Sequence, residues 1–186
     1  MESLQTGLKD WQAVCRALET GRQIVLLRKG GIHETEGVFE MENREFVMFP
    51  TWLHQRVDWI KDVDMSLAEQ RQTDPEEIEL RVLGRVAEIS RIQSRRQMDA
   101  IDASHIYLPP LIDMRFNYRP ANPLYLIVVR AYSLASPVTI RNTPEYAGCR
   151  SWVPLEKSIL TERAQPVLDD DTFAARVTDL KNRLRI

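Results

Sequence analysis

Apolar residues recur along this chain with two spacings, and the two spacings predict where helices and strands lie. Residues 8–20 carry apolar side chains at helical spacing, and Gly21 follows where a helix would end. Residues 169–184 repeat the helical pattern. This second segment begins with three aspartates and ends with basic residues, which complements a helix dipole. Weaker helical patterns occupy residues 52–70, 94–103 and 111–118.

Other segments have the length and composition of strands, with apolar and β-branched residues between turn signals. They are residues 23–28, 38–41, 45–49, 78–92, 124–134, 138–140 and 151–155. We expect residues 38–41 and 45–49 to be joined near Asn43, and Pro50 to end the second of them. Gly84 is expected to bend residues 78–92 or to divide them into two strands.

The order of these elements bears on the fold class. Helices and strands do not alternate regularly, which disfavours a doubly wound parallel sheet. We therefore expect an α+β fold, with a mixed or antiparallel curved sheet or small barrel and flanking helices. The chain of 186 residues fits one domain over residues 1–165, with residues 166–186 forming a C-terminal helix packed on it.

Composition excludes several classes of protein. With 44% hydrophobic and 28% charged residues, the chain is neither a disordered segment nor a coiled coil. Its longest apolar run, residues 124–129, is far shorter than the roughly 20 residues of a membrane helix. The first residues lack the pattern of a secretory signal, and Cys15 and Cys149 are too few for a disulfide framework. These features predict a cytoplasmic protein with reduced thiols.

Charge is balanced overall but divided along the chain. The net charge of −2 excludes a global basic field that would attract nucleic acid, while leaving a local basic face open. Residues 58–79 hold eight acidic residues against Lys61 and Arg71, whereas residues 81–150 hold ten arginines and five acidic residues. Either the molecule has a basic and an acidic face, or these arginines pair with the acidic segment.

Two segments carry residue types suited to phosphate and base contacts. Arg28 and Lys29 precede Gly30 and Gly31, and exposed N–H groups beside such cations can cradle a phosphate. Arg115 stands among aromatic residues, a mixture that suits stacking together with phosphate contact. The alternatives are a tight turn flanked by solvated charges and a set of core aromatics. The phosphate-loop pattern GxxxxGK[ST] is absent.

A third segment follows the strand that Pro50 is expected to end. There Trp52 can stack on a base, His54 can titrate near neutral pH, and Gln55 can read a base edge. The alternative is that Trp52 lies in the core and His54 makes only local contacts.

Catalysis has weaker support in the sequence. His33, His54 and His105 lack the spacing of metal ligands, so no metal site is predicted. Glu34 and His54 could still act as acid and base in a metal-dependent phosphoesterase or nuclease. Whether the chain is an enzyme stays open at this point, as do its cofactors and its oligomeric state.

Four stretches together resemble a known family. Residues 17–34 (ALETGRQIVLLRKGGIHE), 46–55 (FVMFPTWLHQ), 115–132 (RFNYRPANPLYLIVVRAY) and 144–155 (PEYAGCRSWVPL) look like the domain of unknown function family DUF1802. The resemblance covers about residues 8–160. It implies a bacterial, cytoplasmic domain, and it supplies no catalytic residues because the family has no established activity.

A weaker similarity rests on Gly21, Gln23 and Arg28. A helix, this glycine and a strand ending in arginine are similar to the PUA-like barrels, which include the ASCH and EVE domains and bind RNA or modified bases. We therefore expect a basic and aromatic cleft for RNA, DNA or a nucleotide. In it Arg28, Lys29 and Arg115 would contact phosphate, and Trp52, His54 and Gln55 would face the base. A protein-interaction module using residues 58–79 is the remaining alternative.

Overall fold

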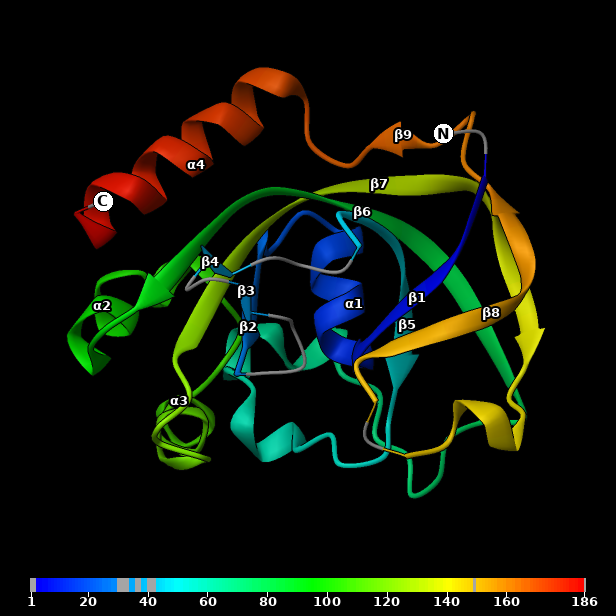
Figure 1. Ribbon diagram of the computed structural model, residues 1–186, viewed down its shortest axis with the longest axis horizontal. Coiled ribbons are helices and arrows are strands. Elements are labelled where there is room, and N and C mark those ends of the chain that lie inside the picture. Colours follow the sequence, from blue (N-terminus) through cyan, green and yellow to red (C-terminus); the bar gives the residue numbers. More distant parts are fainter. Residues whose placement is uncertain (1–2, 30–33, 36–37, 40–42, 149, 186) are drawn as a thin grey trace.

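A strongly curved sheet forms the body of the molecule, and the computed structural model describes it within residues 3–29, 34–35, 38–39, 43–148 and 150–185 (Figure 1). In order across the sheet the strands are β2 (Val25–Arg28), β7 (Leu124–Arg141), β6 (Glu77–Ile92), β5 (Glu45–Thr51), β1 (Ser3–Trp11) and β8 (Trp152–Leu160). The short β9 (Gln165–Pro166) pairs with β7. A separate pair joins β3 (Glu34–Thr35) to β4 (Val38–Phe39).

The sheet is mixed and open. Strands β1 and β5 run parallel, and the other neighbours are antiparallel. Among the described residues, β2 and β8 remain the two ends of the strand order, so the sheet does not close into a barrel. The predicted α+β class with a curved mixed sheet is confirmed, and of the two architectures we expected, the open sheet is the one observed.

In the described part of the chain, four α-helices flank this sheet. Helix α1 (Gln12–Glu19) lies inside its curve, while α4 (Asp170–Leu184) crosses the outer side above β6 and β7 (Figure 1). Helices α2 (Arg95–Ala100) and α3 (Pro109–Asn117) lie at one end. No helix in the described part of the chain is both long and apolar enough to cross a membrane.

The helix expected over residues 8–20 is observed only from Gln12 to Glu19, because residues 8–11 belong to β1. Leu8 is buried in the sheet opposite Met48 of β5, and the helix starts only at Gln12. Leu8 and Trp11 satisfy helical spacing, yet parallel pairing with a distant strand determines their conformation. A pattern read locally contains no information about such a partner.

Strands β6 and β7 are each continuous, although the sequence suggested breaks in both. Residues 134–137 of β7 stand opposite Arg81 alone, because Leu80 pairs with Val138 and Val82 with Ser133. Pro137 falls in this irregularity, where the ladder requires no N–H group from it. The predicted separate strands 124–134 and 138–140 are therefore one strand with a bulge.

Gly84 serves close packing rather than a break in β6. A Cβ atom at this position would lie 2.5 Å from Cε2 of Phe46 and 2.9 Å from Cγ1 of Val129. The register shifts in β6 lie elsewhere, after Leu80 and after Val86. The missing side chain at Gly84 thus leaves room for the buried ring of Phe46 to pack against β6.

Three further expectations fail. Strand β4 pairs with β3 rather than with β5, and β5 continues through Pro50 to Thr51. Beyond Val47, β5 pairs with β1 alone. Pro50 is therefore tolerated, because the other side of the strand has no ladder to which it would have to donate. Residues 52–70 contain two short 3-10 helices instead of one longer helix. The helix expected over residues 111–118 is α3, and it begins two residues earlier, at Pro109.

Strand β5 explains how the core is divided. Phe46 and Met48 belong to a large hydrophobic cluster that includes α1, whereas Val47 and Phe49 belong to a second cluster with residues of β8. Alternate side chains of one strand are thus buried on both faces, which accounts for the unbroken apolar run.

Candidate functional site

A cavity of about 580 Å³ brings together residues from distant parts of the chain. It lies where β1 and β2 end, bordered by α3, by residues 51–54 and by residues 142–151. Three residues predicted from the sequence line it: Arg28, His54 and Arg115. We call it the basic cavity, because Lys9 and Arg150 line it as well.

Arg28 is fixed at this cavity by the end of β1. Its Nη2 lies 2.8 Å from Oδ2 of Asp10 and donates a 2.7 Å hydrogen bond to the carbonyl of Lys9. The residue is only 9% exposed, and its buried Nε has no hydrogen-bond partner. Asp10 also accepts from the N–H of Trp11, so the carboxylate holds the arginine in one orientation.

Arg115 approaches from the last turn of α3. Its side chain makes no ion pair with any described residue, and its buried Nε has no hydrogen-bond partner. A buried guanidinium N–H without an acceptor is destabilising unless water or a ligand satisfies it. The positive charge of Arg115 is therefore not neutralised by a described side chain at the cavity.

The opposite wall is the loop of residues 142–151, which is tied to the sheet at several points. The Nζ of Lys9 donates to the carbonyls of Tyr146 and Gly148, and the N–H of Lys9 donates to the carbonyl of Ser151 at 2.8 Å. Tyr146 in turn accepts a 2.9 Å hydrogen bond from the N–H of Glu156 through its hydroxyl. These contacts hold the wall against the ends of β1 and β8.

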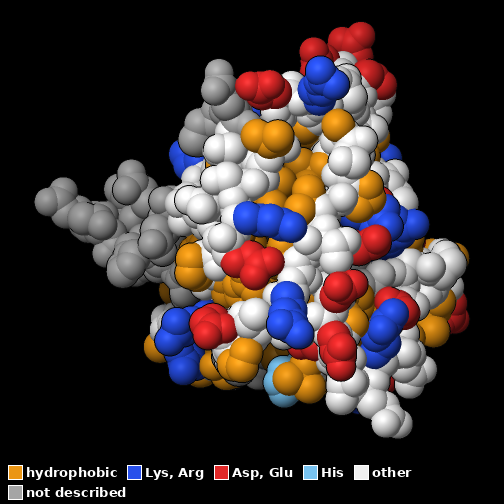
Figure 2. All heavy atoms as spheres, turned by 90° about the vertical axis from the view of Figure 1, so that its right-hand side faces the viewer, with side chains coloured by type: hydrophobic (Ala, Val, Ile, Leu, Met, Phe, Trp, Pro, Cys, Tyr) orange, Lys and Arg blue, Asp and Glu red, His pale blue; other side chains and the backbone are white. Residues whose placement is uncertain are grey.

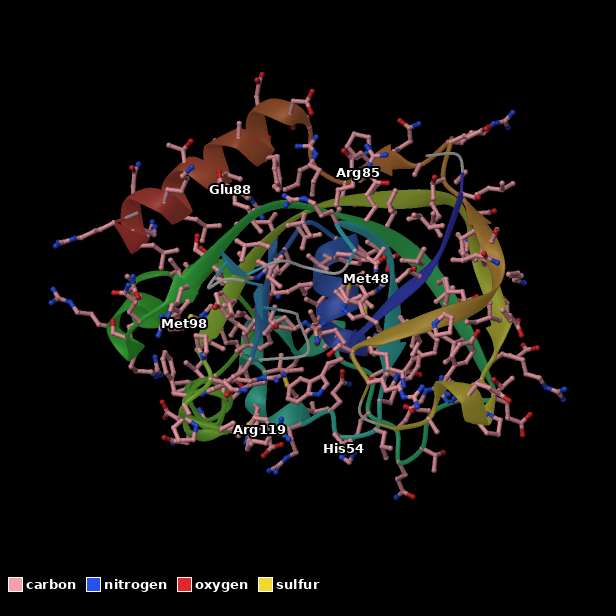
Figure 3. The ribbon with its side chains drawn as sticks, viewed as in Figure 1. Met48, His54, Arg85, Glu88, Met98 and Arg119 are labelled. Atoms are coloured by element: carbon pink, nitrogen blue, oxygen red, sulfur yellow. The ribbon has the colours of Figure 1, made fainter. Side chains whose placement is uncertain are left out.

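His54 lies at the rim, at the lower edge of the view in Figure 3. Its φ of 70° places it in the left-handed region, where residues other than glycine are uncommon. Oδ1 of Asp74 stabilises this bend by accepting from the N–H groups of Trp52 and Leu53, at 2.7 and 2.9 Å. The two hydrogen bonds to Asp74 thus fix the backbone that carries His54 at the basic cavity.

Trp52 and Gln55 do not line the basic cavity. Trp52 is buried in the second hydrophobic cluster, and its indole N–H donates to Oε2 of Glu69 at 3.0 Å. Hydrogen bonds from Arg71 and from this indole hold the pKa of Glu69 below its usual range. Gln55 accepts from the N–H of Ala13 at 2.9 Å and so caps the start of α1. Both residues border a separate cavity of about 540 Å³.

The remaining predicted residues lie apart or outside the described part. Lys29 donates a 2.5 Å hydrogen bond to the carbonyl of Phe116, and desolvation lowers its pKa. Glu34 lies in β3, and its side chain is outside the described part of the structure. Gly30, Gly31, His33 and Cys149 are likewise outside the described residues.

The basic cavity also contains functional candidates that the sequence did not single out. Lys9, Asp10 and Trp11 end a strand that we had read as helix, and Arg150 belongs to a loop. Trp11 lines the cavity and is only partly buried. The local signal is two charged residues followed by an aromatic residue in Lys9–Trp11, and these side chains reach the cavity because β1 pairs with β5 and β8.

Comparison with known proteins identifies the family. A family model described as a domain of unknown function, DUF1802, matches residues 7–179. The chain belongs to the DUF1802 family. The resemblance stated from the four sequence stretches is thereby confirmed. A comparison with curated proteins gives no match.

Two solved structures are similar to this DUF1802 chain, both of the protein ZmASCH from Zymomonas mobilis. A Tyr-to-Phe mutant of that protein is 10% identical with a TM-score of 0.47, covering 82% of this chain and 90% of its own. A Ser-to-Ala mutant is 9% identical with a TM-score of 0.45, covering 93% and 94%. Both scores lie below 0.5, too low to assign a function.

The arginines of residues 81–150 do not pair with the acidic segment as a set. Among the described ion pairs of these arginines, only that of Arg81 with Glu79 involves an acidic residue of 58–79. Arg85, Arg95 and Arg130 pair with carboxylates elsewhere in the chain. The face over β8 and its neighbours shows basic and acidic side chains interspersed (Figure 2). On this face positive charge is not segregated, whereas the basic cavity brings four cations together.

The side chains described in this DUF1802 structure offer no preformed metal site. Among the described residues, no group of three or more His, Cys, Asp or Glu side chains is placed to hold an ion. Cys15 is a buried free thiol whose pKa is raised, chiefly by desolvation and also by Asp10. A buried neutral thiol is a poor nucleophile.

Proposed function

We propose that this DUF1802 chain binds a nucleotide or nucleic acid through phosphate groups in the basic cavity. One observation carries the proposal: Arg28 and Arg115, from separate elements, line one cavity together with Lys9 and Arg150. Guanidinium groups bind phosphate oxygens through paired hydrogen bonds. A fold that gathers these cations without neutralising Arg115 supports an anionic ligand.

Other residues that line the cavity have the chemistry to contact the base of a nucleotide. Trp11 lines the cavity and is only partly buried, with one part packed against the large hydrophobic cluster, and an indole at such a wall can stack on a base. Trp52 was expected in this role, but its burial and its bond to Glu69 assign it to the core. His54 at the rim is close enough to the cations to contact the same ligand.

The alternatives gain less support from the described side chains. In the acidic segment, Asp64 is buried in a bidentate pair with Arg22, and Asp74 caps residues 52–54. Carboxylates engaged in this way maintain the fold, which weighs against a protein-docking role for the whole segment. The hydrolytic alternative needs Glu34 beside His54, and the side chain of Glu34 lies outside the described part of the structure.

The test is binding of the full chain to labelled single-stranded RNA, single-stranded DNA and nucleoside 5′-monophosphates, measured by fluorescence anisotropy or calorimetry across a salt series. Phosphate contacts release counterions, so the logarithm of the affinity should fall linearly with the logarithm of the salt concentration. Arg115→Ala should weaken binding, and Arg119→Ala should not, because Arg119 lies beyond α3 and outside the cavity lining. Absence of binding, or binding indifferent to salt, would refute the proposal.

A further inference from the structure

Resting on the proposed function, we infer that the basic cavity recognises a terminal phosphate. The ligand is a phosphomonoester at the end of a single strand or on a free nucleotide, in preference to the phosphodiesters inside a strand. The charge, the donors and the size of the cavity each support this inference.

Charge is the first argument. The lining holds four cations and two carboxylates: Lys9, Arg28, Arg115 and Arg150 with Asp10 and Asp74. Arg28 pairs with Asp10, whereas neither Arg115 nor Arg150 forms an ion pair with a described residue, which leaves two positive charges in excess at these two arginines. A phosphomonoester carries about −1.5 to −2 at neutral pH. An internal phosphodiester carries a single negative charge and leaves part of the excess unbalanced. The monoester is therefore the better electrostatic match.

The hydrogen-bond donors lead to the same ligand. Asp10 and the carbonyl of Lys9 hold one end of the Arg28 guanidinium, whereas its Nε has no partner. Arg115 adds a second guanidinium, which forms no ion pair with a described residue, and Arg150 adds an exposed third from the loop. A terminal phosphate offers three acceptor oxygens to such donors, while a phosphodiester offers two. Convergence of three arginines on one cavity suits the group with more acceptors.

Size gives the third argument. A volume of about 580 Å³ lies within the usual range of roughly 300–1,000 Å³ for small-molecule sites. A duplex presents its phosphates along a continuous surface that cannot enter such a space. One nucleotide can enter, with its phosphate toward the arginines and its base toward Trp11.

The experiment compares one short single-stranded RNA with a 5′-phosphate, with a 3′-phosphate and with hydroxyl groups at both ends. A nucleoside 5′-monophosphate and inorganic phosphate serve as competitors. At least one phosphorylated end should raise the affinity of the full chain about tenfold over the unphosphorylated strand. Arg115→Ala and, separately, Arg150→Ala should remove most of this preference. Arg119→Ala is the matched control and should retain it.

The outcomes separate this inference from the proposed function. Equal affinity for phosphorylated and unphosphorylated strands would overturn the terminal-phosphate preference and leave nucleic-acid binding standing. Competition by inorganic phosphate as strong as by the nucleoside monophosphate would overturn recognition of a nucleotide. If no strand and no nucleotide binds, the proposed function itself fails. Arg150 is exposed on a loop, so its variant keeps the test valid even if Arg115→Ala unfolds.

Discussion

The Nη2 atom of Arg28 lies 2.8 Å from Oδ2 of Asp10, and both side chains are almost fully buried at the base of the basic cavity. Isolated charges at such a depth are costly, whereas a well-oriented pair is tolerated. The pair joins the end of β2 to the end of β1, two strands at different positions in the sheet. Fold and candidate site therefore depend on the same contact.

We expect Asp10→Ala to lower the free energy of unfolding by about 3–5 kcal/mol, because it leaves the buried guanidinium without its counter-charge. Urea denaturation of the purified chain measures the change. Arg56→Ala breaks an exposed pair with Asp58 and is the control, which should leave the midpoint nearly unchanged. A small effect of Asp10→Ala would show that solvent reaches Arg28 more freely than its burial indicates.

Trp11→Ala should weaken nucleotide binding by about 1–3 kcal/mol, the usual contribution of one base stacked on an aromatic ring. Trp11→Phe should retain much of the affinity. The control is Trp52→Phe, which loses the hydrogen bond to Glu69 and should affect stability more than binding. Calorimetric titration of each variant with a nucleoside monophosphate gives the comparison. The assignment of Trp11 to the base would be wrong if Trp52→Phe alone reduced affinity.

Gln55→Ala should destabilise the chain by about 1 kcal/mol and leave ligand affinity intact. Its side chain caps the first turn of α1 by accepting from the N–H of Ala13, and losing such a cap commonly costs about 0.5–2 kcal/mol. Thermal unfolding and anisotropy on the same preparation separate the two effects. Lost affinity with unchanged stability would restore the sequence-based view of Gln55 as a base reader.

Gly84→Ala should lower stability by about 1–3 kcal/mol, the usual cost of overpacking a core. The added methyl group would clash with the ring of Phe46, which is fully buried in the core. Chemical denaturation measures the loss. The double variant Gly84→Ala, Phe46→Leu tests the cause, because a smaller partner should recover part of it. Full additivity of the two losses would exclude the contact as the reason.

The sequence predicts those features of this chain that local signals determine. The helix expected over residues 169–184 is observed as Asp170–Leu184, because Asp169 caps it and accepts from the N–H of Thr172 at 2.7 Å. Arg28 could be singled out because it ends an apolar strand. Long-range pairing determines the rest. Trp11 belongs to a strand that lines the cavity, and not to a helix, because β1 pairs in parallel with β5. Gln55 caps α1, a helix more than forty residues away in the chain.

His105 should make the stability of the chain depend on pH. The residue is fully buried, and its pKa is lowered to about 4, chiefly by desolvation and further by Lys61, while Asp102 partly opposes the shift. Its Nδ1 accepts from the N–H of Tyr107 at 3.2 Å, which requires that nitrogen to be unprotonated. Folding therefore favours the neutral ring, whereas the unfolded chain protonates it near the ordinary value of about 6.5.

This contribution should be complete above pH 6.5 and should be lost as pH falls toward 4, because the unfolded state binds the proton first. A shift of this size corresponds to about 3 kcal/mol. Urea denaturation at a series of pH values measures it for the unsubstituted chain, for His105→Asn and for His54→Asn. His105→Asn should be less stable throughout but should show a shallower decline in this window. His54→Asn should follow the unsubstituted chain, because His54 lies exposed at the cavity rim. Parallel declines in all three proteins would assign the pH dependence to carboxylates instead of to His105.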